Sequence, residues 1–176
     1  MFELTIRAAI LDGRIYRLLD NSPEALFRSM GVVLVAAVAF ALGARTIEFT
    51  GAEGSQVTVV LLAVTSVLTS WALWSFVAFV VGRILGGSAD YRLMLRSLGL
   101  VFGPGVLLVF MDTPAVGPSL FAIGKLWMLA AGFVAVSEAH KIGLFKAFVP
   151  TVLGWTTSQL LLPLILLGLP PPQVVG

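Results

Sequence analysis

The stretch that decides the fold is VTVVLLAVTSVLTSWALWSFVAFVVGRI, residues 57–84, whose 28 residues hold one charged side chain, Arg83. About 20 predominantly apolar residues are enough for a helix to cross the roughly 30 Å hydrocarbon core of a bilayer. A helix over 57–84 is longer than this. We therefore expect it to span a membrane and to tilt or to project beyond the bilayer.

The whole chain shares this apolar character. Of its 176 residues, 59% are hydrophobic and 11% are charged, which is less than half of the roughly 25% charged residues usual in soluble domains. So few polar residues cannot give every helix a polar face, and we predict a polytopic membrane protein. The net charge is +2 and the basic residues are scattered, so nothing indicates binding to nucleic acid. There is no cysteine, hence no disulfide, thiolate metal site or cysteine nucleophile.

Polar segments divide the chain into five apolar stretches. We predict an all-α fold, a polytopic transmembrane helical bundle with spans at about 29–48, 57–84, 93–111, 119–140 and 144–168. The Pro-rich tail 169–176 should be extended, because proline cannot continue a helix.

The segment 1–28 precedes the first span and has a different pattern. Charged residues interrupt it, and one apolar stripe at helical spacing predicts an amphipathic N-terminal helix: Leu4, Ala8, Leu11, Ile15 and Leu18. This helix would lie in the headgroup region or pack under the bundle.

The distribution of basic residues sets the expected orientation. With five spans, nine of the eleven Lys and Arg residues fall on the side of the N-terminus and two, Arg45 and Lys125, on the other. Cytoplasmic loops carry the excess of Lys and Arg. We therefore expect a cytoplasmic N-terminus and a C-terminus outside, with the bacterial inner membrane as the expected location.

Ionisable groups deep in a membrane are the default candidates for function. Lys125 is the deepest in this chain, about a turn and a half inside the fourth span. Its stem could snorkel outward, or its ammonium could pair with Asp112 at the outer end of the third span in a pore or substrate site.

The second span is rich in hydroxyl groups. Thr65 and Thr69 lie one above the other at i and i+4, as do Ser66 and Ser70, and the fifth span adds a polar run at 156–159 that ends in Gln159. Such groups usually bond between helices or back to the i−4 carbonyl, and the alternative is a polar pathway.

Two other features of the spans concern packing. Gly99 and Gly103 have GxxxG spacing and Pro104 follows, which indicates close helix packing with a kink or, alternatively, a broken helix that forms a binding site. The tryptophans at 71, 74, 127 and 155 lie near the middle of spans, and we expect them to be buried between helices.

The stretch AVSEAHKIGLFKA, residues 135–147, holds the one histidine of the chain. Glu138 and His140 are two residues apart and would not share a helix face. A single histidine with no second ligand at i+3 or i+4 is a poor metal site. We expect a cytoplasmic helix-end loop with a solvated imidazole. The alternative is an ionisable functional cluster.

The chain resembles the Yip1 family of five-span membrane proteins, in its bacterial branch. The resemblance covers most of the chain and rests on PEALF at 23–27, GRILGGSADY at 82–91, Gly103-Pro104, and the stretch from Trp127 to Ala147. It implies a helical bundle with the N-terminus inside. Eukaryotic members bind prenylated Rab GTPases through a cytoplasmic N-terminal region, but the short segment here does not carry that property over. The family brings no catalytic residues.

The function expected from these observations is that of a non-enzymatic scaffold or membrane-organising factor, acting through helix and lipid contacts. A small transporter or channel that uses the second span with Lys125 and Asp112 is the alternative, and an intramembrane enzyme using Glu138 and His140 is third. No cofactor or metal is expected. The expected partners are membrane lipids, and other membrane proteins or further copies of the chain.

Overall fold

The computed structural model describes Gly13 and residues 24–43 and 56–161, without the side chains of Gln56, Val59, Leu160 and Leu161. The predicted amphipathic helix apart from Gly13, the loop with Arg45 and the Pro-rich tail lie outside these residues.

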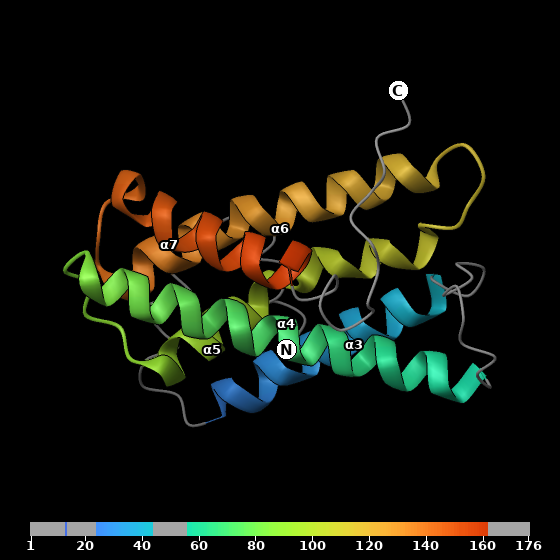
Figure 1. The fold of residues 1–176 in the computed structure, drawn as a ribbon, viewed down its shortest axis with the longest axis horizontal. Helices are drawn as coiled ribbons and strands as arrows, with labels where there is room; N and C mark the ends of the chain where they lie inside the picture. Colours follow the sequence, from blue (N-terminus) through green and yellow to red (C-terminus); the bar gives the residue numbers. More distant parts are fainter. Residues whose placement is uncertain (1–12, 14–23, 44–55, 162–176) are drawn as a thin grey trace.

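Every regular element in the described part is a helix, and the long helices run near the long axis of the molecule (Figure 1). In chain order they are α3 (Ala25–Gly43), α4 (Gln56–Ile84), α5 (Tyr91–Val101), the 3-10 helix η1 (Gly103–Phe110), α6 (Gly117–His140), α7 (Leu144–Thr156) and the π-helix η2 (Thr157–Leu161). Helix α4 is central, packing against α3, α5 and α7. Helix α6 lies against η1, α5 and α7.

Three of these helices are long and apolar enough to cross a membrane: α3, the Val60–Ile84 part of α4, and α6. Helices α5 and η1 together form a fourth candidate with a bend of 40° between them. The expected all-α membrane bundle is thus confirmed at this level. The count of five spans stays a prediction, since α7 has 13 residues and continues in η2 to Leu161, where the described part ends.

The bend between α5 and η1 lies where the sequence reads Gly103-Pro104. Proline has no N–H to donate and cannot continue the α-helical pattern. Pro104 lies in the first turn of η1, whereas the preceding α5 packs closely on α3 through Gly99. A Cβ atom added to Gly99 would lie 2.6 Å from Cβ of Ser29, so only glycine permits this approach.

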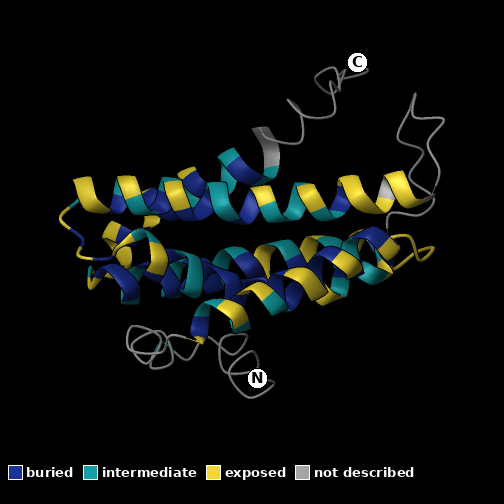
Figure 2. Ribbon diagram, turned by 90° about the horizontal axis from the view of Figure 1, so that it is seen from below, coloured by how far each residue is buried: buried dark blue, intermediate teal, exposed yellow. Residues whose placement is uncertain are grey.

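The distribution of side chains is that of a bundle with an apolar exterior. On α3 the buried face carries small residues such as Ala25, Ala36 and Ala37, whereas Phe27 and Val35 point outward. Exposed residues lie along the outer faces of the helices (Figure 2). Many of them are large and apolar, as expected where the surroundings are lipid.

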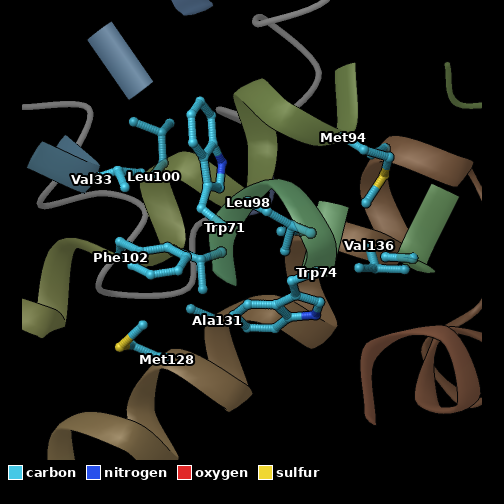
Figure 3. Close-up of a cluster of buried hydrophobic side chains, with 14 of the residues drawn as sticks. Val33, Trp71, Trp74, Met94, Leu98, Leu100, Phe102, Met128, Ala131 and Val136 are labelled. Carbon is cyan, nitrogen blue, oxygen red and sulfur yellow. The ribbon is translucent and has the colours of Figure 1, made fainter. Parts of the chain in front are cut away.

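Trp74 of α4 is the largest fully buried side chain and lies within the hydrophobic cluster of Figure 3. Two glycines make room for its indole. A Cβ atom at Gly132 of α6 would lie 2.6 Å from Cζ2, and one at Gly154 of α7 would lie 2.4 Å from Cδ1. The expectation of burial between helices is correct for Trp71 and Trp74 and wrong for Trp127, which is 40% exposed.

Candidate functional site

A cavity of about 330 Å³ lies within the bundle. Residues spaced at i and i+3 or i+4 on several helices face it: Ala36 and Phe40 of α3, Ser66 and Ser70 of α4, Phe121, Lys125 and Met128 of α6, and Trp155 of α7 with Gln159 of the following η2. Val67, Phe102 and Leu108 complete the lining. Residues three or four apart share a helix face, which explains how one helix presents two or three side chains to one space.

Lys125 is the charged residue of this lining. Its Nζ donates a hydrogen bond to Oε1 of Gln159 in η2 and lies 5.5 Å from the centre of the Phe121 ring. Eight residues separate it from Gly117, the start of α6, or roughly 12 Å at 1.5 Å per residue. The ammonium therefore bonds to a neighbouring helix inside the bundle, and outward snorkelling is not what the structure shows.

The predicted ion pair with Asp112 is also absent from the described part of the chain. Asp112 lies in the exposed turn between η1 and α6, and Lys125 bonds to Gln159 instead. Sequence reasoning noted Gln159 as one of several polar residues but gave no sign that it would meet Lys125. The two residues are 34 positions apart, on either side of the turn from α6 to α7, so no local spacing indicates the contact.

The hydroxyl groups of α4 divide between two faces. Thr65 and Thr69 are exposed, and Thr69 Oγ1 donates to the Thr65 carbonyl at 2.8 Å, which is the expected bond to the i−4 carbonyl. Ser66 and Ser70 line the cavity instead. Ser70 Oγ donates to the Ser158 carbonyl at 3.0 Å and so ties α4 to η2.

The π-helical turn η2 shapes one wall of the cavity. Its wider turn follows α7 directly and places Gln159 at the ammonium of Lys125, while the Ser158 carbonyl accepts from Ser70. Nε2 of Gln159 lies 3.4 Å from Oγ of Ser158, which itself donates to the Trp155 carbonyl at 3.1 Å. Single π-helical turns are rare in proteins, and those that occur are often found at functional sites.

His140 is not in a solvated loop, so that prediction is wrong. It is the last residue of α6 and is 1% exposed. Its Nε2 lies 3.1 Å from the Ala78 carbonyl of α4. A Cβ atom at Gly82 would lie 2.3 Å from Nε2, and one at Gly87 would lie 2.2 Å from Nδ1, so the imidazole occupies space that two glycines leave open.

The neighbouring residues of this stretch have separate places. Lys141 caps α6 in the left-handed conformation, with φ of 55°, and is exposed. Glu138 is half-buried, and its Oε1 would lie 2.9 Å from a Cβ atom at Gly13. Glu138 thus faces Gly13 and His140 faces α4, in agreement with the argument from their spacing.

One end of the bundle gathers cationic side chains. The α4–α5 and α6–α7 connections meet there, since the Ser88 N–H donates to the His140 carbonyl at 3.1 Å. Helix α3 begins at the same end, where Ser29 Oγ donates to the Arg96 carbonyl at 2.6 Å. Cations come from all these elements: Arg28, Arg83, Arg92, Arg96, Lys141 and Lys146. They outnumber the carboxylates that the described residues place at this end, which are Glu24, paired with Arg28 at 2.6 Å, Asp90 and Glu138.

Among the described residues, no three His, Asp or Glu side chains are placed to hold a metal ion. Comparison of the chain with protein-family models, curated proteins and solved structures finds no match.

Proposed function

We propose that this chain is a non-enzymatic integral membrane protein of the Yip1-like type, which organises a bacterial inner membrane through contacts with lipids and with other helices. In this proposal five spans place the N-terminus in the cytoplasm. The basic end of the bundle, defined by the six cations named above, faces the cytoplasmic leaflet.

The observation that carries the proposal is the combination of charge and exposed apolar surface at the basic end. Phe27, Ile84 and Phe145 are 76%, 76% and 95% exposed, and all three lie at the helix ends that meet there. Apolar side chains beside cations suit the boundary between headgroups and acyl chains. Each Lys or Arg near an anionic leaflet contributes about 1 kcal/mol of attraction.

The use of the buried polar groups supports a structural role. Trp71 Nε1 donates to the Leu95 carbonyl at 3.0 Å, and Tyr91 Oη donates to the Ala72 carbonyl at 3.3 Å. Ser29, Ser70 and His140 likewise bond to backbone carbonyls of another helix. These polar side chains bond one helix to another, which supports a structural role for them.

The test is co-purification from native membranes in a mild detergent, with identification of the accompanying proteins and lipids. The double variant Phe27→Ser, Phe145→Ser should insert and fold, because both side chains are exposed, yet lose the accompanying molecules. The control variant Phe110→Ser, Ile123→Ser removes two side chains that are each 51% exposed and lie away from the basic end. If both variants retain the wild-type set, contacts at the basic end do not carry the function.

A small transporter is the second candidate, and the cavity beside Lys125 is the observation that favours it. Three residues expected along its path, Thr65, Thr69 and Asp112, are instead exposed. We therefore place the transporter second.

A further inference from the structure

The polar groups that line the cavity beside Lys125 offer more hydrogen-bond donors than free acceptors. Most of its lining is apolar, including three phenylalanines, and no acidic side chain among the described residues belongs to it. The Ser70 hydroxyl is already bonded to Ser158, and Gln159 Oε1 already accepts from Lys125. The Ser66 hydroxyl has no hydrogen-bond partner among the described residues.

The Lys125 ammonium has more hydrogen-bond donors than the lining satisfies. It has three donors, of which Gln159 takes one. In the described part of the chain no carboxylate pairs with it. A cation in apolar surroundings is strongly unfavourable unless an anion accompanies it. The site therefore matches a ligand that brings a negative charge and hydrogen-bond acceptors.

The size and walls of the cavity indicate the rest of the ligand. At ~30 Å³ for each water-sized group, a volume of 330 Å³ holds about eleven non-hydrogen atoms. This is too small for a whole phospholipid with two acyl chains. Phe40, Phe102 and Met128 offer no polar atoms, which suits an alkyl chain.

We infer that the cavity binds the carboxylate end of a single-chain amphiphile of the fatty-acid class. Its carboxylate accepts from Lys125 and Ser66, and its first methylene groups lie against the phenylalanine side chains. Gln159, held by η2, keeps the ammonium in place by accepting one of its protons. The proposed organising function needs no ligand in this cavity, so the two proposals stand or fall separately.

The experiment measures binding of 10-bromodecanoate to the purified full chain in nanodiscs of phosphatidylcholine. Bromine quenches tryptophan fluorescence at contact, and Trp155 lines the cavity. We expect saturable quenching that decanoate reverses and that decanol and decyltrimethylammonium do not reverse. A Trp155→Phe variant should lose most of the saturable signal.

Two pairs of variants test the residues. Lys125→Met should weaken binding by at least about tenfold, the effect of losing a charged hydrogen bond, while Lys146→Met at the exposed start of α7 should bind as wild type does. Ser66→Leu should block the cavity while keeping the ammonium. Thr65→Leu, its exposed neighbour on α4, should leave binding unchanged.

Three outcomes would overturn the inference. Equal competition by decanol would show that the charge is not recognised. Wild-type affinity in both Lys125→Met and Ser66→Leu would place the ligand elsewhere. Displacement of the bromodecanoate by phosphatidylglycerol at equal concentration would assign the ammonium to a phospholipid headgroup. If Lys125→Met fails to fold, the Ser66→Leu and Thr65→Leu pair decides alone.

Discussion

Replacing Gly132 by alanine tests how tightly the bundle closes around Trp74. The added Cβ atom would lie 2.6 Å from Cζ2 and 3.0 Å from Cη2 of the indole, and 3.3 Å from Cγ2 of Thr151. Gly124 of the same helix is the matched control, since its nearest neighbour would be the Pro104 carbonyl oxygen at 3.6 Å, an ordinary contact.

The expected difference follows from two opposing effects. Alanine is better than glycine inside a helix by about 1 kcal/mol, and both variants gain this. Overpacking a filled core costs about 1–3 kcal/mol, and only Gly132→Ala incurs it. The indole has little room to retreat, because Gly154 already approaches it closely and Trp74 is fully buried. We expect Gly132→Ala to be less stable than Gly124→Ala by about 1–3 kcal/mol.

The assay is unfolding of the purified chain in dodecyl maltoside by added sodium dodecyl sulfate, followed by far-ultraviolet circular dichroism. A double-mutant cycle with Trp74→Phe locates the cause, because phenylalanine lacks the two ring atoms nearest to Gly132. The alanine should then destabilise much less in the Trp74→Phe background. Equal stability of Gly132→Ala and Gly124→Ala, or an unchanged effect in that background, would refute the packing argument.

Three further predictions concern other parts of the chain. His140→Ala should lower the free energy of unfolding by about 2–4 kcal/mol through an empty cavity and a lost hydrogen bond, whereas exposed Lys146→Ala should change it little in the same assay. Pro104→Ala should remain inserted and folded with a modest change in thermal stability, since η1 is also held by packing against α3 and α6; loss of folding would show that the proline alone maintains the bend. A reporter fused after Gly176 should be active only outside the cytoplasm and one within 86–90 only inside, and the reverse pattern at either site would contradict the five-span topology.

The sequence allowed the membrane class and most helix positions to be predicted, for a physical reason. A span must satisfy its backbone hydrogen bonds within one segment, so length and apolar composition are enough to indicate it. The predicted ranges 57–84 and 119–140 agree with α4 and α6 to within two residues at each end. Pro104 likewise acts on its own backbone, and a bend in the third span was among the expectations.

Contacts between spans could not be predicted in the same way. The imidazole of His140 fits against Gly82 and Gly87, more than fifty residues away, and no period in the sequence joins them. The glycines at 82, 86 and 87 were noted only as part of a family resemblance. Gly82 and Gly87 leave room for the imidazole of His140, whereas Gly86 has a positive φ of 89° and no atom of the described residues within 4 Å of an added Cβ. The role of Gly82 and Gly87 becomes visible only when the C-terminal end of α6 is placed against them. The polar composition of 138–141 predicts a loop. Composition alone does not show in which direction each side chain points, so the burial of His140 could not be predicted from it.

The hydrogen bonds between helices explain why Lys125 stands apart. Ser29, Trp71 and Tyr91 each bond to a backbone carbonyl of another helix. Every residue has such a carbonyl, so this kind of bond needs no particular partner side chain. Such bonds contribute about 0.6 kcal/mol each in membranes, and they are complete without any ligand. The ammonium of Lys125 instead bonds to the side chain of Gln159, beside an open cavity, and its other two donors meet no acceptor in the described part of the chain. If its role were only to hold helices, Lys125→Met should lower stability through the lost bond to Gln159 and should leave any effect of decanoate unchanged. If the ammonium instead binds an anionic ligand, we expect Lys125→Met to abolish the stabilisation by decanoate. A variant that still gains stability from decanoate as wild type does would show that Lys125 is only a structural contact.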